Sequence, residues 1–295
     1  MFFTGLCSIT FRKKRPREVV ELVARAGLTG IEWGGDVHVP HGNLRRALAV
    51  RGLTEEAGLC VLSYGSYYRV VQSEIDRIPF DSVLETALEL GAPEIRVWAG
   101  VHGSAEADLS YRERLVSESR RIADVAAAEG VRISYEFHRG TLNDSGPASA
   151  ALLRDVAHPN VRTYWQPEVS ESPAQRLMSL EQVLPYLSNL HVFHWSGQGS
   201  TVRLALAQGR EEWGPLPRKG GVRGRHPRAA SGVRAAAPSR AVPRRRPDVE
   251  GLGVGVPVAV WRGLSCLRSN RRCPFFADWK GAHFDEAAKS KRWIK

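Results

Sequence analysis

The chain has 295 residues, 25% of them charged, and a formal net charge of +11. The basic excess belongs to one segment. Residues 1–213 contain 23 Lys and Arg against 26 Asp and Glu, whereas residues 214–272 contain 14 basic residues against two acidic ones. No stretch reaches the roughly 18 apolar residues of a membrane span, and no Cys-x-x-Cys pair indicates a cysteine metal site or a disulfide framework. A cytoplasmic protein with no membrane partner is therefore expected.

Short apolar runs alternate with helical periodicity along residues 1–213. Runs rich in Val, Ile and aromatic residues predict seven strands, over residues 2–10, 29–35, 59–68, 94–100, 132–138, 162–168 and 189–195. Apolar residues at helical spacing predict helices over residues 16–27, 43–58, 80–92, 111–130, 147–157 and 177–187. This alternation is typical of an α/β fold, a (β/α)8 TIM barrel that is incomplete at its eighth unit. An open doubly wound sheet is the alternative, but no Gly-x-Gly-x-x-Gly follows the first strand.

Polar and aromatic side chains gather at the predicted strand ends, where a barrel keeps its active site. Glu136 and His138 are two residues apart on one strand, so their side chains point to the same side. A buried carboxylate there needs a cation, and either a metal ion or a structural ion pair with Arg96 can provide it. His191 and His194 are three residues apart and cannot both face inward along a regular strand.

Five segments in barrel order carry a resemblance to a known family. They are IEWGGDVHVP, IRVWAG, YEFHRGTLND, YWQP, and NLHVFHW followed by RLALAQGREEW. They resemble the sugar phosphate isomerase/epimerase group of xylose isomerase-like TIM barrels over about residues 5–213. The resemblance implies a divalent cation and the isomerisation or epimerisation of a sugar, keto-sugar or sugar phosphate by proton transfer next to a carbonyl. The substrate is then a small sugar.

The same resemblance implies a set of site residues. The metal ligands are Glu136, Gln166 and His191, with Gln166 standing where the wider family usually has Asp. Oxygen and imidazole ligands without a thiolate favour Mn²⁺, Mg²⁺ or Co²⁺. Glu136 also serves as an acid/base group, and His138 is the second catalytic candidate. The side chains expected to bind substrate are Glu32, His38, Tyr64, Arg96, Trp98, Trp165, His194 and Arg203.

Residues 214–295 follow no hydrophobic period. We interpret them as a basic, largely disordered tail behind a barrel domain of residues 1–213. An eighth strand with its carboxylate is missing, yet a one-nucleotide offset allows residues 231–234 to encode Leu-Glu-Phe-Val. We therefore interpret the tail as a frameshifted eighth unit and expect impaired activity. Strands one and seven should then have unpaired edges, although residues 252–261 are apolar enough to pair with an edge.

Two other functions stay open. The same barrel superfamily includes metal-dependent AP endonucleases, but the acidic character of residues 1–213 disfavours DNA. The basic tail predicts weak, sequence-blind adhesion to nucleic acid. It has no aromatic residue between Trp213 and Trp261, so no specific nucleic-acid recognition is expected. The sequence leaves open which sugar and metal are used and whether the protein is a homo-oligomer.

Overall fold

A computed structural model describes residues 2–197, 202–209 and 258–262. Seven parallel strands form most of a barrel, as the alternation of apolar runs predicts. They are β1 (Phe2–Cys7), β2 (Gly30–Gly34), β3 (Cys60–Arg69), β4 (Glu94–Trp98), β5 (Arg132–Tyr135), β6 (Val161–Trp165) and β7 (Leu187–Val192). Each overlaps one of the seven predicted strands, so the predicted fold is confirmed.

An eighth strand closes the ring in the opposite direction. β10 (Val258–Arg262) pairs antiparallel with β1 and with β7, which gives the order β1-β10-β7-β6-β5-β4-β3-β2. The expectation that strands one and seven have unpaired edges is therefore wrong. An antiparallel strand satisfies both edges because backbone hydrogen bonding does not require the missing parallel unit.

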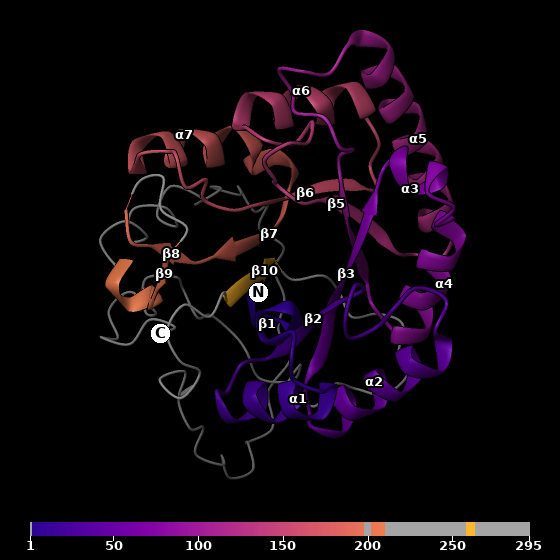
Figure 1. The fold of residues 1–295 in the computed structure, drawn as a ribbon, viewed down its shortest axis with the longest axis vertical. Coiled ribbons are helices and arrows are strands. Elements are labelled where there is room, and N and C mark those ends of the chain that lie inside the picture. Colours follow the sequence, from indigo (N-terminus) through magenta and orange to yellow (C-terminus); the bar gives the residue numbers. More distant parts are fainter. Residues whose placement is uncertain (1, 198–201, 210–257, 263–295) are drawn as a thin grey trace, which may run out of the picture.

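Six helices of more than two turns connect the parallel strands. They are α1 (Pro16–Arg25), α2 (Leu44–Glu56), α4 (Phe80–Leu90), α5 (Leu109–Ala128), α6 (Gly146–Val156) and α7 (Pro173–Val183). Asn43, Asp108 and Ser172 fix three of the helix starts, because each side chain accepts the backbone N–H three residues ahead. The helices stand outside the strands in an arc that runs from α1 through α4 and α5 to α7 (Figure 1).

Shorter elements complete the described chain. They are η1 (Ser8–Phe11), α3 (Gln72–Ile75), η2 (Leu184–Tyr186), η3 (Leu206–Gly209) and the antiparallel pair β8 (His194–Trp195) and β9 (Arg203–Leu204). β8, β9 and η3 lie in the sector between α7 and α1 (Figure 1). Among the described residues, no helix is long and apolar enough to cross a bilayer. Apart from β10, the predicted basic tail of residues 214–295 lies outside the described residues.

Candidate active site

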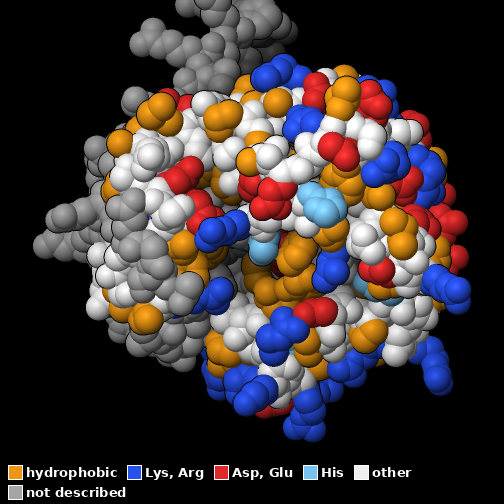
Figure 2. Space-filling view, turned by 45° about the horizontal axis from the view of Figure 1, so that its top comes forward, with side chains coloured by type: hydrophobic (Ala, Val, Ile, Leu, Met, Phe, Trp, Pro, Cys, Tyr) orange, Lys and Arg blue, Asp and Glu red, His pale blue; other side chains and the backbone are white. Residues whose placement is uncertain are grey.

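Four of the barrel strands bring ionisable side chains into the barrel interior. Glu32 lies on β2, Arg96 on β4 and His191 on β7, and Glu136 directly follows β5. All four are buried. A hollow with apolar side chains in it opens on the face of the molecule in Figure 2, and Lys, Arg, Asp, Glu and His side chains surround it. Such a mouth at the strand ends is where TIM barrels perform chemistry.

Arg96 joins the two carboxylates. Its Nε donates to Glu32 Oε1 at 3.0 Å, and its Nη1 contacts Glu136 Oε2. Trp98 Nε1 donates to the same Glu136 oxygen at 2.6 Å. Gly65 leaves room for this group, because a Cβ there would lie 2.6 Å from Arg96 Nη2 and 3.1 Å from Glu32 Oε1. The ion pair between Glu136 and Arg96, which the sequence left as an alternative, is thus present.

Both members of the Arg96–Glu32 pair are charged. Burial alone would raise the pKa of Glu32, but Arg96, His191 and Ser63 together hold that pKa well below its usual range. Burial lowers the pKa of Arg96, and the Glu32 carboxylate reverses this, so that the net shift of the pKa is upward. A permanent guanidinium therefore sits in the barrel interior.

His191 lies between two groups of acceptor atoms. On one side, its Nδ1 is 3.3 Å from Gln166 Oε1 and 3.9 Å from Glu136 Oε1. On the other side, its Nε2 is 3.5 Å from Glu32 Oε2 and 3.5 Å from Cys7 Sγ. The predicted ligands Glu136, Gln166 and His191 are therefore brought together.

The Nδ1 side has the donor chemistry of a divalent cation site. Glu136 Oε2 is held by Arg96, and its Oε1 is directed toward Nδ1 of His191. The carbonyl oxygen of Gln166 and the Nδ1 of His191 are both potential ligands, and these two atoms face each other. Carboxylate, amide and imidazole donors suit Mn²⁺, Mg²⁺ or Co²⁺. These residues fit such a cation.

A second group of potential ligands occupies the Nε2 side. Cys7, Glu32 and His191 bring one ligand atom each to within 4.8 Å of one another. Burial and the nearby Glu32 raise the pKa of the Cys7 thiol well above its ordinary value, so the thiolate that a metal needs is disfavoured. Both oxygens of Glu32 are already engaged, by Arg96 and by Ser63 at 2.7 Å. The Nδ1 side is therefore the better cation site.

One ring nitrogen of His138 is hydrogen-bonded, and the other has no hydrogen-bond partner in the part of the chain that the structure describes. Its ring stacks on Trp98, with centroids 4.3 Å apart and planes at 23°. Nδ1 is 2.7 Å from the backbone oxygen of Arg139, which can only accept, so Nδ1 carries the proton. Burial lowers the pKa of His138 from its ordinary value. The neutral ring then presents an unprotonated Nε2, which is what a general base requires.

Aromatic and basic side chains surround Trp98. Tyr67 packs beside it at 5.8 Å, and the guanidinium of Arg69 lies 5.6 Å from its ring centroid. Tyr67 has a left-handed backbone with φ of 59° and carries Arg96 over its ring at 5.0 Å. Non-glycine residues held in this region cluster at functional sites.

Two predicted substrate-binding aromatics point away from the mouth. Tyr64 donates to the Val39 carbonyl at 2.7 Å, and Trp165 Nε1 donates to Ser179 Oγ of α7 at 3.1 Å. Both are fully buried between strands and the outer layer. This corrects the prediction for both residues. Their neighbours along the strands face the interior, so the alternation of a strand turns Tyr64 and Trp165 outward.

Three further candidates have different places. His38 is 1% exposed, and its Nε2 donates to the Lys14 carbonyl at 3.1 Å, so it is a core histidine instead of a substrate contact. His194 packs against η3, which agrees with the expectation that only one of the two strand-seven histidines faces inward. Arg203 is exposed and lies over the ring of Trp195 at 5.3 Å.

Six residues in or around the site were not among the sequence candidates: Cys7, Ser63, Gly65, Tyr67, Arg69 and Tyr164. Ser63 and Gly65 are two residues apart, as are Cys7 and Gly5 on the first strand. Because alternate residues of a strand face the same side, comparison with Glu32 could have indicated that these residues face the barrel interior. Small residues at such positions are a weak signal, because their side chains alone do not point to a particular reaction.

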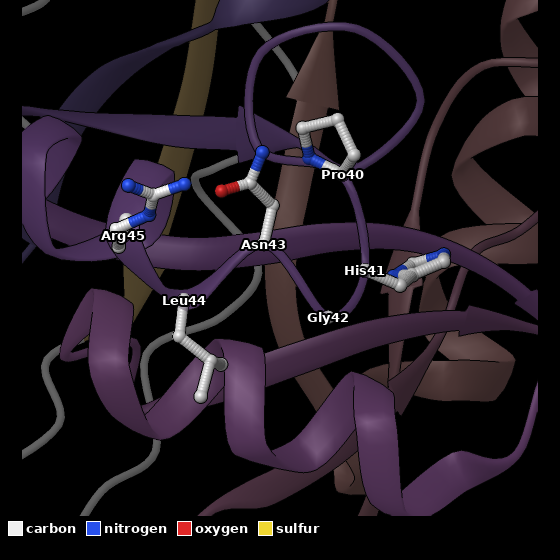
Figure 3. A pocket seen from close by; sticks show the side chains of 6 residues that line it. All are labelled: Pro40, His41, Gly42, Asn43, Leu44 and Arg45. Atoms are coloured by element: carbon white, nitrogen blue, oxygen red, sulfur yellow. The ribbon is translucent and has the colours of Figure 1, made fainter.

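A surface recess lies elsewhere, on the loop before α2. It has a volume of 630 Å³ and is lined by residues Pro40, His41, Gly42, Asn43, Leu44 and Arg45 (Figure 3). None of the Glu136, Gln166 or His191 donors takes part in it. The cation site and this recess are therefore separate features.

Comparisons with known proteins agree with this architecture. A family model described as "Xylose isomerase-like TIM barrel" matches residues 20–167. A 3-dehydroshikimate dehydratase of Bacillus anthracis is 26% identical over 201 residues, which are 63% of this chain and 70% of that protein.

Two solved structures share the fold. The probable 3-DHS dehydratase AsbF of Bacillus anthracis has a TM-score of 0.57 at 22% identity, over 66% of this chain and 74% of that one. The D-allulose 3-epimerase of Methylomonas sp. has a TM-score of 0.53 at 17% identity, over 72% of this chain and 80% of that one.

Proposed function

From the premise that this chain belongs to the xylose isomerase-like TIM barrel family, we propose that it is a metal-dependent isomerase or epimerase of a sugar, keto-sugar or sugar phosphate. The observation that carries the proposal is the convergence of Glu136 Oε1 and Gln166 Oε1 on His191 Nδ1. These three residues would hold Mn²⁺, Mg²⁺ or Co²⁺. When bound, the cation would polarise the carbonyl of the substrate.

His138 would carry out the proton transfer. With Nδ1–H donated to a backbone carbonyl, its Nε2 is free to remove a proton from the carbon beside the carbonyl. Returning that proton to the former carbonyl carbon, while the proton of the neighbouring hydroxyl moves to the former carbonyl oxygen, would complete an isomerisation. Inversion at one carbon would need a second group on the opposite face of the sugar. The acid/base role that the resemblance gives to Glu136 stays a prediction.

Substrate contacts come from the rim. We assign Trp98, with Tyr67 beside it, to the sugar face, because an aromatic ring covers the apolar side of a sugar. Arg69 and Arg203 offer guanidinium groups to hydroxyl or anionic oxygens. The likeness to D-allulose 3-epimerase, which has also been solved in complex with D-allulose, supports a small sugar as substrate.

A dehydratase is the second candidate, and the curated relative favours it. That protein is named a 3-dehydroshikimate dehydratase. Dehydration also begins with loss of the proton next to a carbonyl, and the neighbouring hydroxyl then leaves with a proton as water. The same His138 base and the same cation would serve both reactions.

One assay separates these functions. The full chain is incubated in D₂O with Mn²⁺, Mg²⁺ or Co²⁺ and a panel of ketoses, aldoses, sugar phosphates and 3-dehydroshikimate, beside an abasic-site DNA cleavage assay. We expect deuterium to appear beside the carbonyl of one sugar. Water loss from 3-dehydroshikimate alone would select the dehydratase. Cleavage of abasic DNA without any exchange would refute both and support an endonuclease-like hydrolase.

Other expectations stay predictions. These are the cytoplasmic location, a homo-oligomer, non-specific adhesion of the basic tail to nucleic acid, and impaired activity from a frameshifted eighth unit. Residues 214–257 and 263–295, on which the last two depend, lie outside the described residues. The nucleotide sequence around codon 214 tests the frameshift directly.

A further inference from the structure

The orientation of His191 depends on a carboxylate from a strand that is not adjacent to its own. β2 and β7 are not neighbours, since β1 and β10 stand between them. Even so, Glu32 Oε2 lies 3.5 Å from His191 Nε2 across the barrel interior. Both side chains are buried, so water cannot take the place of either partner.

Glu32 is itself fixed and can only accept. Arg96 donates to its Oε1 at 3.0 Å and Ser63 donates to its Oε2 at 2.7 Å. If Nε2 of His191 were unprotonated, its lone pair would face an anionic oxygen in a water-poor interior, which is strongly unfavourable. Nε2 must therefore carry the proton. Cys7 Sγ, also 3.5 Å away, is only a weak donor and does not compete with an ionised acceptor.

We infer that Glu32 is the positioning residue of His191. It keeps a proton on Nε2 and fixes the ring plane, so that Nδ1 faces Gln166 Oε1 and Glu136 Oε1 and would exchange its own proton for a bound cation. A carboxylate behind a ligating histidine has this effect in many metal sites. The ring of Tyr164 packs edge-on against His191, with centroids 5.0 Å apart and planes at 89°, and further limits its rotation. The inference depends on the proposed function in one respect only, namely that the ligand of Nδ1 is the proposed cation.

Nuclear magnetic resonance tests the tautomer without any metal. Long-range ¹H–¹⁵N correlation of the full chain labelled with ¹⁵N-histidine distinguishes Nε2–H from Nδ1–H, and the His191→Gln variant assigns the signal. We expect Nε2–H in the wild type. Cys7→Ser should keep this tautomer. A wild-type His191 with an unprotonated Nε2, or an Nε2 that loses its proton in Cys7→Ser, would overturn the inference.

Mn²⁺ titration tests the consequence. Glu32→Gln should bind Mn²⁺ about 10–100-fold more weakly than the wild type, the usual effect of losing such a partner. Glu94→Gln is the matched control, because Glu94 is equally buried in the barrel but hydrogen-bonds Ser188 and Asn189. It should change the affinity less than about twofold.

The outcomes separate this inference from the proposed function. Equal Mn²⁺ affinity in Glu32→Gln and the wild type would overturn the positioning role. If the wild type binds no Mn²⁺ but His191 is the Nε2–H tautomer, the cation proposal fails and the positioning by Glu32 stands. Should Glu32→Gln not fold, the tautomer measured in the wild type and in Cys7→Ser still decides.

Discussion

Arg96 Nε lies 3.0 Å from Glu32 Oε1, and the two side chains are 1% and 2% exposed. The same guanidinium contacts Glu136, so one cation serves two carboxylates from separate strands. Exposed ion pairs contribute little because water screens them. The Arg96–Glu32 pair is buried, so the loss of either residue would leave the other as a buried charge without a counter-ion.

Replacing Arg96 should therefore strongly destabilise the fold. Arg96→Met keeps much of the side-chain volume but leaves Glu32 and Glu136 without their cation. We expect a loss of about 3–5 kcal/mol in the free energy of unfolding, measured by urea denaturation. Arg51→Met is the control, because it removes only the exposed contact with Glu55 at 2.9 Å. That change should cost about 0–1 kcal/mol. Equal losses in both variants would contradict the proposed role of Arg96.

Gly65 tests the space around the same guanidinium. In Gly65→Ala the new Cβ would lie 2.6 Å from Arg96 Nη2, so the charged group must move. We expect destabilisation of about 1–3 kcal/mol and a loss of about 100-fold in kcat/KM, because a displacement of about 1 Å is enough for this. Gly52→Ala in α2 meets nothing within 4 Å and should be neutral or slightly stabilising. Full activity in Gly65→Ala would argue against the need for this geometry.

The parallel part of the fold follows from local pattern, and the closing strand does not. Strands such as Glu94–Trp98 are short apolar runs between helices of clear periodicity, and those signals are local. Val258–Arg262 is also a short apolar run, but its partners are Phe2–Cys7 and Leu187–Val192, far away in sequence. Its direction depends on those non-local contacts, which no periodicity encodes.

Residue chemistry and strand parity together were enough to predict that some of these side chains lie close together. Glu136 and His191 are ionisable residues at strand ends, and they do meet. Tyr64 and Trp165 also lie near strand ends, but a shift of one residue along a strand turns the side chain to the other side of the sheet. The distance of a residue from the end of a strand does not show to which side of the sheet its side chain points. Glu32 and His191 belong to strands that are not adjacent, and only the assembled barrel brings their side chains together.

Gln166→Asp tests the cation site from the ligand side. The substitution replaces the amide, whose Oε1 lies 3.3 Å from His191 Nδ1, with a shorter side chain that carries a negative charge. Because cation affinity rises with the number of charged ligands, we expect Mn²⁺ to bind on the order of tenfold more tightly. Isothermal titration calorimetry measures this. Gln182→Asp on α7, away from these donors, should leave the affinity unchanged. An unchanged or weaker affinity in Gln166→Asp would place the cation elsewhere.

His38 should make stability depend on pH. Its Nε2–H is bound by the Lys14 carbonyl, and its Nδ1 is buried without a partner among the described residues. Burial lowers the pKa of His38 from 6.5. Below pH 6.5, His38 is therefore protonated to a greater extent in the unfolded chain than in the folded one. The folded state loses stability as the pH falls through this range.

The comparison with His38→Gln isolates this effect. Gln keeps an N–H for the Lys14 carbonyl but does not titrate. Urea unfolding at about pH 7.5 and about pH 5.5 should show a larger loss of stability in the wild type than in the variant. The same loss in both proteins would assign the pH dependence to other groups.

His138 should matter for activity and little for the fold. Its Nε2 is the proposed base, while the ring stacks on Trp98 and donates from Nδ1 to the Arg139 carbonyl. His138→Gln keeps a planar polar side chain but removes the base, so kcat should fall by about 10²–10⁴-fold. The rate at which deuterium enters the substrate from D₂O should fall in parallel, because it reports the proton-transfer step. His158→Gln is the matched control, since His158 pairs with Asp124 at 3.0 Å on the loop before β6, at the opposite end of the barrel. If His138→Gln retains both kcat and deuterium exchange, another group removes the proton, and Glu136 becomes the first candidate.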